Sequence, residues 1–116
     1  MVDITGKVQN NIPDGCSGIV YVYVPHTTAA VTINEGADPS VKNDILNYLQ
    51  ELIPHNAGYT HLEGNSDAHI KSSFIGNSVC LLVENGELIL GTWQAVFFCE
   101  FDGPRNRKVY LKIIER

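Results

Sequence analysis

The chain has 116 residues, enough for one domain with a single packed core, and its apolar fraction of 44% and charged fraction of 18% are ordinary for a globular protein. Its net charge of −5 argues against nucleic acid or an anionic membrane surface as the main partner. No apolar run approaches the roughly 18 residues of a membrane span, and the N-terminus does not resemble a secretory signal, so we expect a single cytoplasmic domain over residues 1–116.

The first half of the chain predicts two strands and a long helix. Residues 18–24, GIVYVYV, are rich in β-forming side chains and stop at Pro25, and TTAAVTIN continues in an extended pattern. Asp38 then provides a helix N-cap directly before Pro39. Apolar residues recur at helical spacing from that point, which predicts a helix over residues 39–53 with one buried stripe, formed by Val41, Ile45, Leu49 and Leu52.

The second half predicts a short helix followed by β structure. Ser66 or Asp67 can cap a helix that runs through Ile75 and ends at Gly76. Further on, Asn85-Gly86 is the usual signal for a two-residue hairpin turn, and KVYLKII closes the sheet. The predicted fold class is α+β, mainly an antiparallel β-sandwich or partly closed barrel with one long and one short α-helix.

The strand expected at residues 93–101 is apolar on both faces. Trp93, Phe97 and Cys99 share one face, and Val96 and Phe98 lie on the other. An antiparallel sheet in a small monomer usually leaves one face in contact with water. We therefore expect either the long helix of the same chain or another subunit to cover the second face.

Residues 55–73 hold three of the four histidines. Helical spacing places His69 on the same side as Ser72 and Ser73, and a loop containing Gly64 could fold His61 back toward them. The spacing of seven residues between the two histidines is not a metal signature in itself. From the residues alone, solvated surface histidines are the simpler interpretation.

Three blocks of the chain resemble the YjbQ family (uncharacterised protein family 0047). SVCLLVENGELILGTWQAV resembles the family signature, HTTAAVTINEGADPSVKNDI its N-terminal block and YTHLEGNSDAHIKSSFIG its central block. The stretch FFCEFDGPRNRKVYLKI is similar to the family's usual tail. The resemblance implies a small α+β chain that assembles as a homotrimer. For some members it also implies a secondary thiamine-phosphate synthase activity, which joins a hydroxymethylpyrimidine diphosphate to a thiazole phosphate and releases pyrophosphate.

The resemblance also implies a metal site. The matched histidines are His26, His61 and His69, and three imidazoles with an open fourth position are the usual arrangement of a catalytic zinc ion. Zinc is the first expectation for this divalent ion, with nickel, cobalt and iron left open. Carboxylates in the matching blocks are the candidate catalytic groups, either as a base or as partners that orient the imidazole rings: Glu35, Glu63 and Asp67. His55 lies outside the motif, and we expect an ordinary exposed side chain there.

A phosphorylated substrate needs fixed donors for its negative charge. The short helix offers Lys71, Ser72 and Ser73 together with free N–H groups at its start, and the GPRNR turn offers Arg105 and Arg107. Trp93 and Gln94 complete the candidate substrate-binding residues through the GTWQ block. Each has a simpler reading: a polar helix face for Lys71 to Ser73, a solvated turn for the arginines, and a core side chain for Trp93.

Two other functions fit the same residues. The first is a metal-assisted hydrolase of a small phosphate ester or amide, in which a zinc-bound hydroxide attacks and Glu35 or Glu63 acts as the base. The second is a non-catalytic trimeric module whose histidines hold a structural ion. A reaction between two aromatic substrates separates the synthase from the hydrolase, and a closed metal site without an exchangeable water indicates the module.

Overall fold

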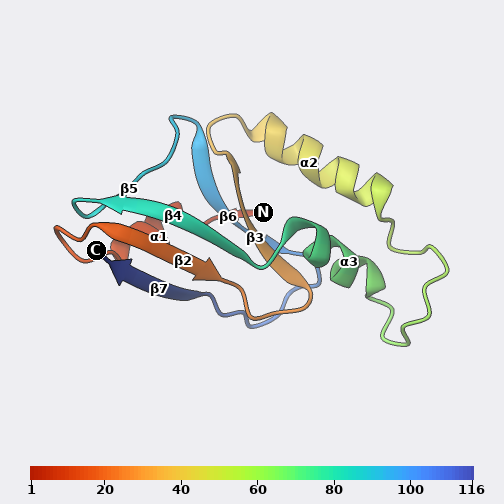
Figure 1. The fold of residues 1–116 in the computed structure, drawn as a ribbon. Helices are drawn as coiled ribbons and strands as arrows, with labels where there is room; N and C mark the ends of the chain where they lie inside the picture. Colours follow the sequence, from red (N-terminus) through yellow and green to blue (C-terminus); the bar gives the residue numbers. More distant parts are fainter.

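Two antiparallel sheets pack against each other in the computed structural model, which describes residues 1–116 (Figure 1). One sheet has four strands in the order β5-β4-β2-β7, and the other has three in the order β1-β6-β3. The strands of the first are Glu87–Leu88, Ser78–Glu84, Gly18–Tyr23 and Tyr110–Glu115, and those of the second are Val2–Asp3, Gln94–Glu100 and Ala29–Glu35. The predicted α+β class, with mainly antiparallel strands, is confirmed.

The hydrophobic core lies between these sheets, because alternate side chains of each strand point inward. The four-stranded sheet contributes residues such as Val20, Val22 and Leu81, and the three-stranded sheet contributes Val96 and Phe98. Helix α1 (Thr5–Asn10), which the sequence analysis did not predict, adds Val8 to the same cluster. Its first residue is tied to the sheet, since the Thr5 hydroxyl accepts a hydrogen bond from the Val96 N–H at 2.9 Å.

Two glycine positions are required by the backbone. Asn85 and Gly86 both have positive φ, 51° and 83°, so the predicted two-residue turn between β4 and β5 is confirmed. Gly18 has a φ of 151°, and a Cβ atom there would lie 2.0 Å from the carbonyl oxygen of Ile114. Only glycine therefore allows β2 to approach β7 at that point.

Helix α2 (Pro39–Leu52) begins as predicted but packs differently. The Asp38 carboxylate caps it by accepting a hydrogen bond from the Ser40 N–H at 2.9 Å. The prediction of a buried stripe is wrong, because no residue of α2 is buried and Leu52 is 55% exposed. The stripe residues Val41, Ile45 and Leu49 are only half-buried. Helix α2 follows β3, the edge strand of its sheet (Figure 1), and its first turn also lies near Phe97 of β6.

Strand β6 is buried on both faces within the single chain. Val96 and Phe98 belong to the core cluster, while Ala95, Phe97 and Cys99 on the opposite face are also buried. Other parts of the same chain thus cover both sides of this strand, and no second subunit is needed to explain its apolar pattern.

The outward face of the four-stranded sheet exposes several large apolar side chains. Its side chains come from three neighbouring strands, and the rings of Tyr23 and Tyr110 stack with centroids 6.5 Å apart. We call this surface the outer patch; its residues are Tyr21, Tyr23, Leu82, Tyr110 and Ile114, each between 42% and 61% exposed. None of the helices is long and apolar enough to cross a membrane.

Candidate functional site

A pocket of about 450 Å³, which we call the histidine pocket, joins His26 to the polar segment. It lies between the segment that connects β2 to β3 and helix α3 (Ser66–Ile75). Its lining residues are mostly polar: His26, Thr27, Ala29, His69, Ser72, Ser73, Gly76 and Asn77. His26 and His69, which lie 43 positions apart in the sequence, therefore face the same space.

His61 packs directly against His69. The two rings meet edge to face with centroids 5.4 Å apart. His61 also lines a second pocket of about 250 Å³, together with His55 and Tyr59 from the same loop. The histidine pocket is lined by His26 and His69 and the second pocket by His55 and His61, so the two pockets together are lined by all four histidines of the chain.

His26 is held by the backbone of a distant segment. Its Nε2 accepts a hydrogen bond from the Lys108 N–H at 2.8 Å. A ring nitrogen that accepts is unprotonated, so the neutral ring carries its proton on Nδ1. In this arrangement His26 has no free lone pair to offer a metal ion.

The three predicted metal ligands are near one another without forming a ready metal site. No group of three or more histidine, cysteine, aspartate or glutamate side chains is arranged to hold an ion. His61 and His69 are adjacent and could supply two ligands. His26 could become the third only by releasing the Lys108 N–H.

The two predicted serines differ in their contacts. Ser72 is 8% exposed, and its Oγ is buried without a hydrogen-bond partner although the residue lines the histidine pocket. Buried hydroxyls are nearly always paired. This oxygen does not contact solvent, so a ligand in the pocket would reach it only after the Ser72 side chain turns toward the pocket. The Ser73 hydroxyl donates to the carbonyl oxygen of His69 at 3.0 Å and so is already engaged.

Lys71 and Asp67 form a buried ion pair on another side of α3. The Lys71 ammonium contacts Asp67 Oδ2 at 3.2 Å, and His55 Nδ1 lies 3.1 Å from Asp67 Oδ1. Burial raises the pKa of Asp67, but hydrogen bonds from His55 and Lys71 outweigh it and hold that pKa below its ordinary value. Lys71, which the sequence assigned to substrate, is 8% exposed and does not line the histidine pocket.

The loop that carries His61 is tied to the turn after β6. The Arg105 Nη2 donates to Glu63 Oε2 and to Asp102 Oδ2, each at 3.0 Å. Asn65 Nδ2 donates to the same two carboxylates, at 3.1 Å and 2.7 Å. The Asn65 hydrogen bond, together with Arg105, outweighs desolvation and lowers the pKa of Asp102. Glu63 Oε1 lies 4.0 Å from His61 Nε2, which makes Glu63 the predicted carboxylate nearest that ring.

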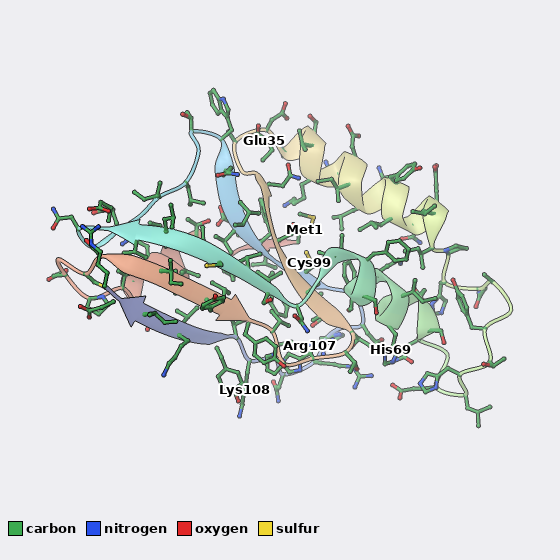
Figure 2. The ribbon with its side chains drawn as sticks, in the orientation of Figure 1. Met1, Glu35, His69, Cys99, Arg107 and Lys108 are labelled. Atoms are coloured by element: carbon green, nitrogen blue, oxygen red, sulfur yellow. The ribbon has the colours of Figure 1, made fainter.

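Three predicted site residues lie elsewhere. Glu35 ends β3, whereas Ala29 at the start of that strand lines the histidine pocket, so they are separated by about 20 Å at roughly 3.3 Å per residue. Figure 2 likewise shows Glu35 and His69 far apart. The Glu35 carboxylate accepts hydrogen bonds from the N–H groups of Ala37 and Asp38 ahead of α2. Trp93, 64% exposed rather than in the core, lines a separate pocket with Gln94.

Sequence reasoning missed three polar residues around this region. His55 is exposed as expected, but it contacts the buried Asp67 across twelve positions of sequence. Asn65 and Asp102 link the His61 loop to the turn after β6. Nothing in the sequence around Asp102 indicates a partner 37 positions away.

Comparison with known proteins gives a consistent result over the full chain. The family described as "UPF0047 protein YjbQ-like" matches residues 1–116. The UPF0047 protein MJ1081 of Methanocaldococcus jannaschii is 58% identical over 116 residues, which cover 98% of this chain and 84% of that protein. The UPF0047 protein YugU of Bacillus subtilis is 50% identical over 117 residues, covering 98% and 89%.

Solved structures show the same fold. A YjbQ/UPF0047 family protein from Clostridium acetobutylicum superposes with a TM-score of 0.93 at 51% identity, covering 97% of this chain and 89% of its own. The conserved hypothetical protein TT1486 from Thermus thermophilus also gives 0.93, at 50% identity, covering 97% and 90%. Both are described as uncharacterised or hypothetical, so they support the fold and the family.

Proposed function

The chain belongs to the YjbQ-like family of UPF0047 proteins, and we propose that its histidine pocket binds a phosphorylated heteroaromatic substrate for a metal-dependent transferase reaction, observable as thiamine-phosphate synthase activity. The observation that carries the proposal is the gathering of His26, His69 and the unpartnered hydroxyl of Ser72 around one pocket. A volume of about 450 Å³ falls within the range of roughly 300–1,000 Å³ for pockets that hold small molecules.

The electrostatics of the pocket support the metal part of the proposal. The pocket is lined by Ser72, Ser73 and Gly76 from the C-terminal half and end of α3, where the helix dipole favours positive charge over anions. No lysine or arginine lines it. A diphosphate group would therefore need its positive charge from protonated histidines or from a divalent ion, and zinc at His61 and His69 is our first expectation. When bound, such an ion would neutralise charge on phosphate oxygens.

The residues of the chain have separate roles in this proposal. His26 and His69 line the pocket wall, and the Ser72 hydroxyl, which bonds no protein group, would bind the substrate when its side chain turns toward the pocket. Glu63 orients His61, and Arg105 and Asn65 fix Glu63 in turn. In the reaction, the thiazole nitrogen forms a bond to the methylene carbon of the hydroxymethylpyrimidine diphosphate while the bond from that carbon to the diphosphate oxygen breaks, and pyrophosphate leaves with the electron pair.

The test is a synthase assay on purified protein with both substrates and a series of divalent metals. We expect thiamine phosphate as product, and we expect His69→Ala and Ser72→Ala each to lower kcat/KM by at least about tenfold. Asn43→Ala, on the exposed surface of α2, is the matched control and should keep full activity. If the protein consumes one phosphorylated substrate when the second substrate is absent, the reaction is a hydrolysis and the synthase proposal is wrong. If neither reaction is observed, the protein is better described as a non-catalytic metal-binding module.

A further inference from the structure

Two segments that are far apart in the sequence meet at His26. One is residues 24–28, between β2 and β3, and the other is residues 101–109, between β6 and β7. The hydrogen bond from the Lys108 N–H to His26 Nε2, 2.8 Å long, joins them at a position that is exposed to water. Water can replace either partner of an exposed hydrogen bond at little cost. The contact therefore persists only if other groups hold the two segments together.

Arg107 holds the two segments together. Its Nη2 donates to the hydroxyl of Thr28 at 2.9 Å and to the carbonyl oxygen of Thr28 at 3.3 Å. Its Nε donates to Glu100 Oε1 at 2.8 Å, and Nη2 also donates to Glu100 Oε2. Arg107 directly precedes Lys108, and Thr28 comes two residues after His26. We call this pair of contacts, Arg107 to Thr28 and Lys108 to His26, the clasp.

The Arg107 side of the clasp is buried and tied to a sheet. Thr28 is 5% exposed, and the Arg107 side chain is 11% exposed. Glu100 is the last residue of β6 and pairs in register with Ala29 of β3. A Cβ atom at Gly103 would lie 2.8 Å from Glu100 Cγ, so the turn after β6 closes tightly over this glutamate. A guanidinium that binds a carboxylate through two nitrogens has a fixed orientation.

The clasp determines which nitrogen of His26 carries the proton. Nε2 accepts from a backbone N–H, which cannot reverse its role, so the neutral ring is protonated on Nδ1. No protein group accepts a hydrogen bond from this Nδ1, and His26 lines the histidine pocket. A metal ion could use Nε2 of His26 only after the clasp opens. With the clasp closed, His26 is a hydrogen-bond donor.

We propose that Arg107, paired with Glu100, is a positioning residue for the histidine pocket, which holds Lys108 against His26 and keeps the Nδ1–H of His26 available to a ligand. Arg107 does not line that pocket, so it acts through His26 and not as the direct phosphate contact that its turn suggested. A donor fixed in advance needs no reorganisation when the ligand binds. Its use by a phosphate oxygen of the substrate rests on the proposed function, whereas the positioning is a property of the unliganded chain.

Figure 2 shows this arrangement in the whole molecule. Arg107, Lys108 and His69 lie in the lower part of the view, and Glu35 lies at the top. The clasp is therefore on the side of the molecule that carries the histidine pocket.

The experiment is a long-range ¹H–¹⁵N correlation spectrum of the imidazole rings, recorded on the ¹⁵N-labelled full chain without ligand or metal, at about pH 8.5, where histidine side chains are generally neutral. The His26 signals are identified by their loss in His26→Ala. We expect a protonated Nδ1 and an unprotonated Nε2. Arg107→Ala should shift the ring toward the Nε2–H form, which free histidine favours. An Nε2–H ring in the unchanged chain, or an unaltered Nδ1–H ring in Arg107→Ala, would overturn the proposal.

Matched controls separate the clasp from other effects of the turn. Lys108→Ala removes the side chain but keeps the backbone donor, so the His26 ring should stay protonated on Nδ1. Arg105→Ala removes the other arginine of the turn, which contacts Glu63 and Asp102, and should also leave the ring unchanged. A shift toward Nε2–H in these controls as large as that in Arg107→Ala would contradict the assignment to Arg107.

Two further variants apply if Arg107→Ala does not fold, because that change leaves Glu100 without its partner. Thr28→Val removes the hydroxyl that Arg107 binds and keeps the shape of the side chain. Arg107→Lys keeps a positive charge beside Glu100 but lacks the fork that also reaches Thr28. Each should raise the Nε2–H fraction of the His26 ring. An unaltered ring in both would also overturn the proposal.

Kinetics test the use of the donor separately. In the synthase assay, Arg107→Ala should lower kcat/KM about fivefold or more in the unchanged chain, and it should have no further effect in a His26→Ala chain. Losses that add in the double variant would show that Arg107 does not act through His26. If the unchanged chain has no synthase activity, the proposed function fails, and the imidazole spectra still decide whether Arg107 positions His26.

Discussion

The Nε2 atom of His26 accepts a hydrogen bond from the backbone N–H of Lys108, a residue 82 positions later in the chain. This contact links the segment after β2 to the segment that leads into β7, two strands that pair along their whole length. Because the donor is a backbone group, the Lys108 side chain is not required for it. The contact fixes the ring that forms one wall of the histidine pocket.

We predict that His61→Ala and His69→Ala each reduce bound divalent metal at least about tenfold, because a lost imidazole removes a ligand from the adjacent pair. His26→Ala should also reduce it, provided that metal binding displaces the Lys108 N–H. His55→Ala is the control, since His55 contacts Asp67 rather than the ring pair. Elemental analysis of purified protein measures the content, and four variants with equal metal would contradict the site.

Lys71→Ala should lower the free energy of unfolding by about 3 kcal/mol, because it leaves the Asp67 carboxylate buried without its ammonium partner. Its main effect would then be on stability rather than on substrate binding. Lys112→Ala, an exposed lysine on β7, is the matched control and should change stability little. Urea unfolding measures both variants, and equal midpoints would show that the buried pair contributes nothing.

Local signals predicted local structure well. Asp38 before Pro39 and the Asn85-Gly86 pair each act through contacts within a few residues, so both were visible in the sequence. The helical spacing of apolar residues identified α2, but it cannot tell whether another element covers the apolar stripe. Helix α1 was missed because six residues containing Gly6 give too short a pattern, and it is held instead by a distant contact between Thr5 and Val96.

The candidate site was also predictable only in part, because many of its contacts join residues that are distant in the sequence. The resemblance marked His26, His61 and His69, and the structure brings their side chains to one region. The partners that fix these residues come from distant turns, as with Arg105 on Glu63. Sequence spacing carries no information about such contacts.

The free energy of unfolding should decrease in acid, because carboxylates that are paired in the folded state become protonated. Hydrogen bonds from Arg107 to Glu100 outweigh desolvation and hold the pKa of Glu100 below its ordinary value. A lowered pKa in the folded state contributes stability that is present above the unfolded value of about 4.3 and is lost as pH falls through the folded value. We therefore expect the free energy of unfolding in urea to fall between about pH 5 and pH 3.

The control for this effect is Glu100→Gln, which removes the titrating group while keeping its shape. The variant should be less stable near neutral pH, because Arg107 loses its charged partner. Its stability should fall less steeply in acid than that of the unchanged chain, with the remaining slope due to Asp38, Asp67 and Asp102. Identical acid slopes for the two proteins would exclude Glu100 as a contributor.

We predict that the chain is a homotrimer in solution and that the outer patch takes part in the subunit contact. Strand β6 gives no reason for assembly, since its own chain buries it, but the outer patch leaves large apolar side chains in water. A closed ring of three needs one surface to meet a different one, and the exposed side of α2 with Tyr48 and Leu52 offers a second apolar surface.

Light scattering should give about three times the chain mass of 12.8 kDa. Tyr23→Glu should shift this toward a monomer, while Thr60→Glu, in an exposed loop outside both surfaces, should not. A monomer at micromolar concentration for the unchanged chain would rule the trimer out.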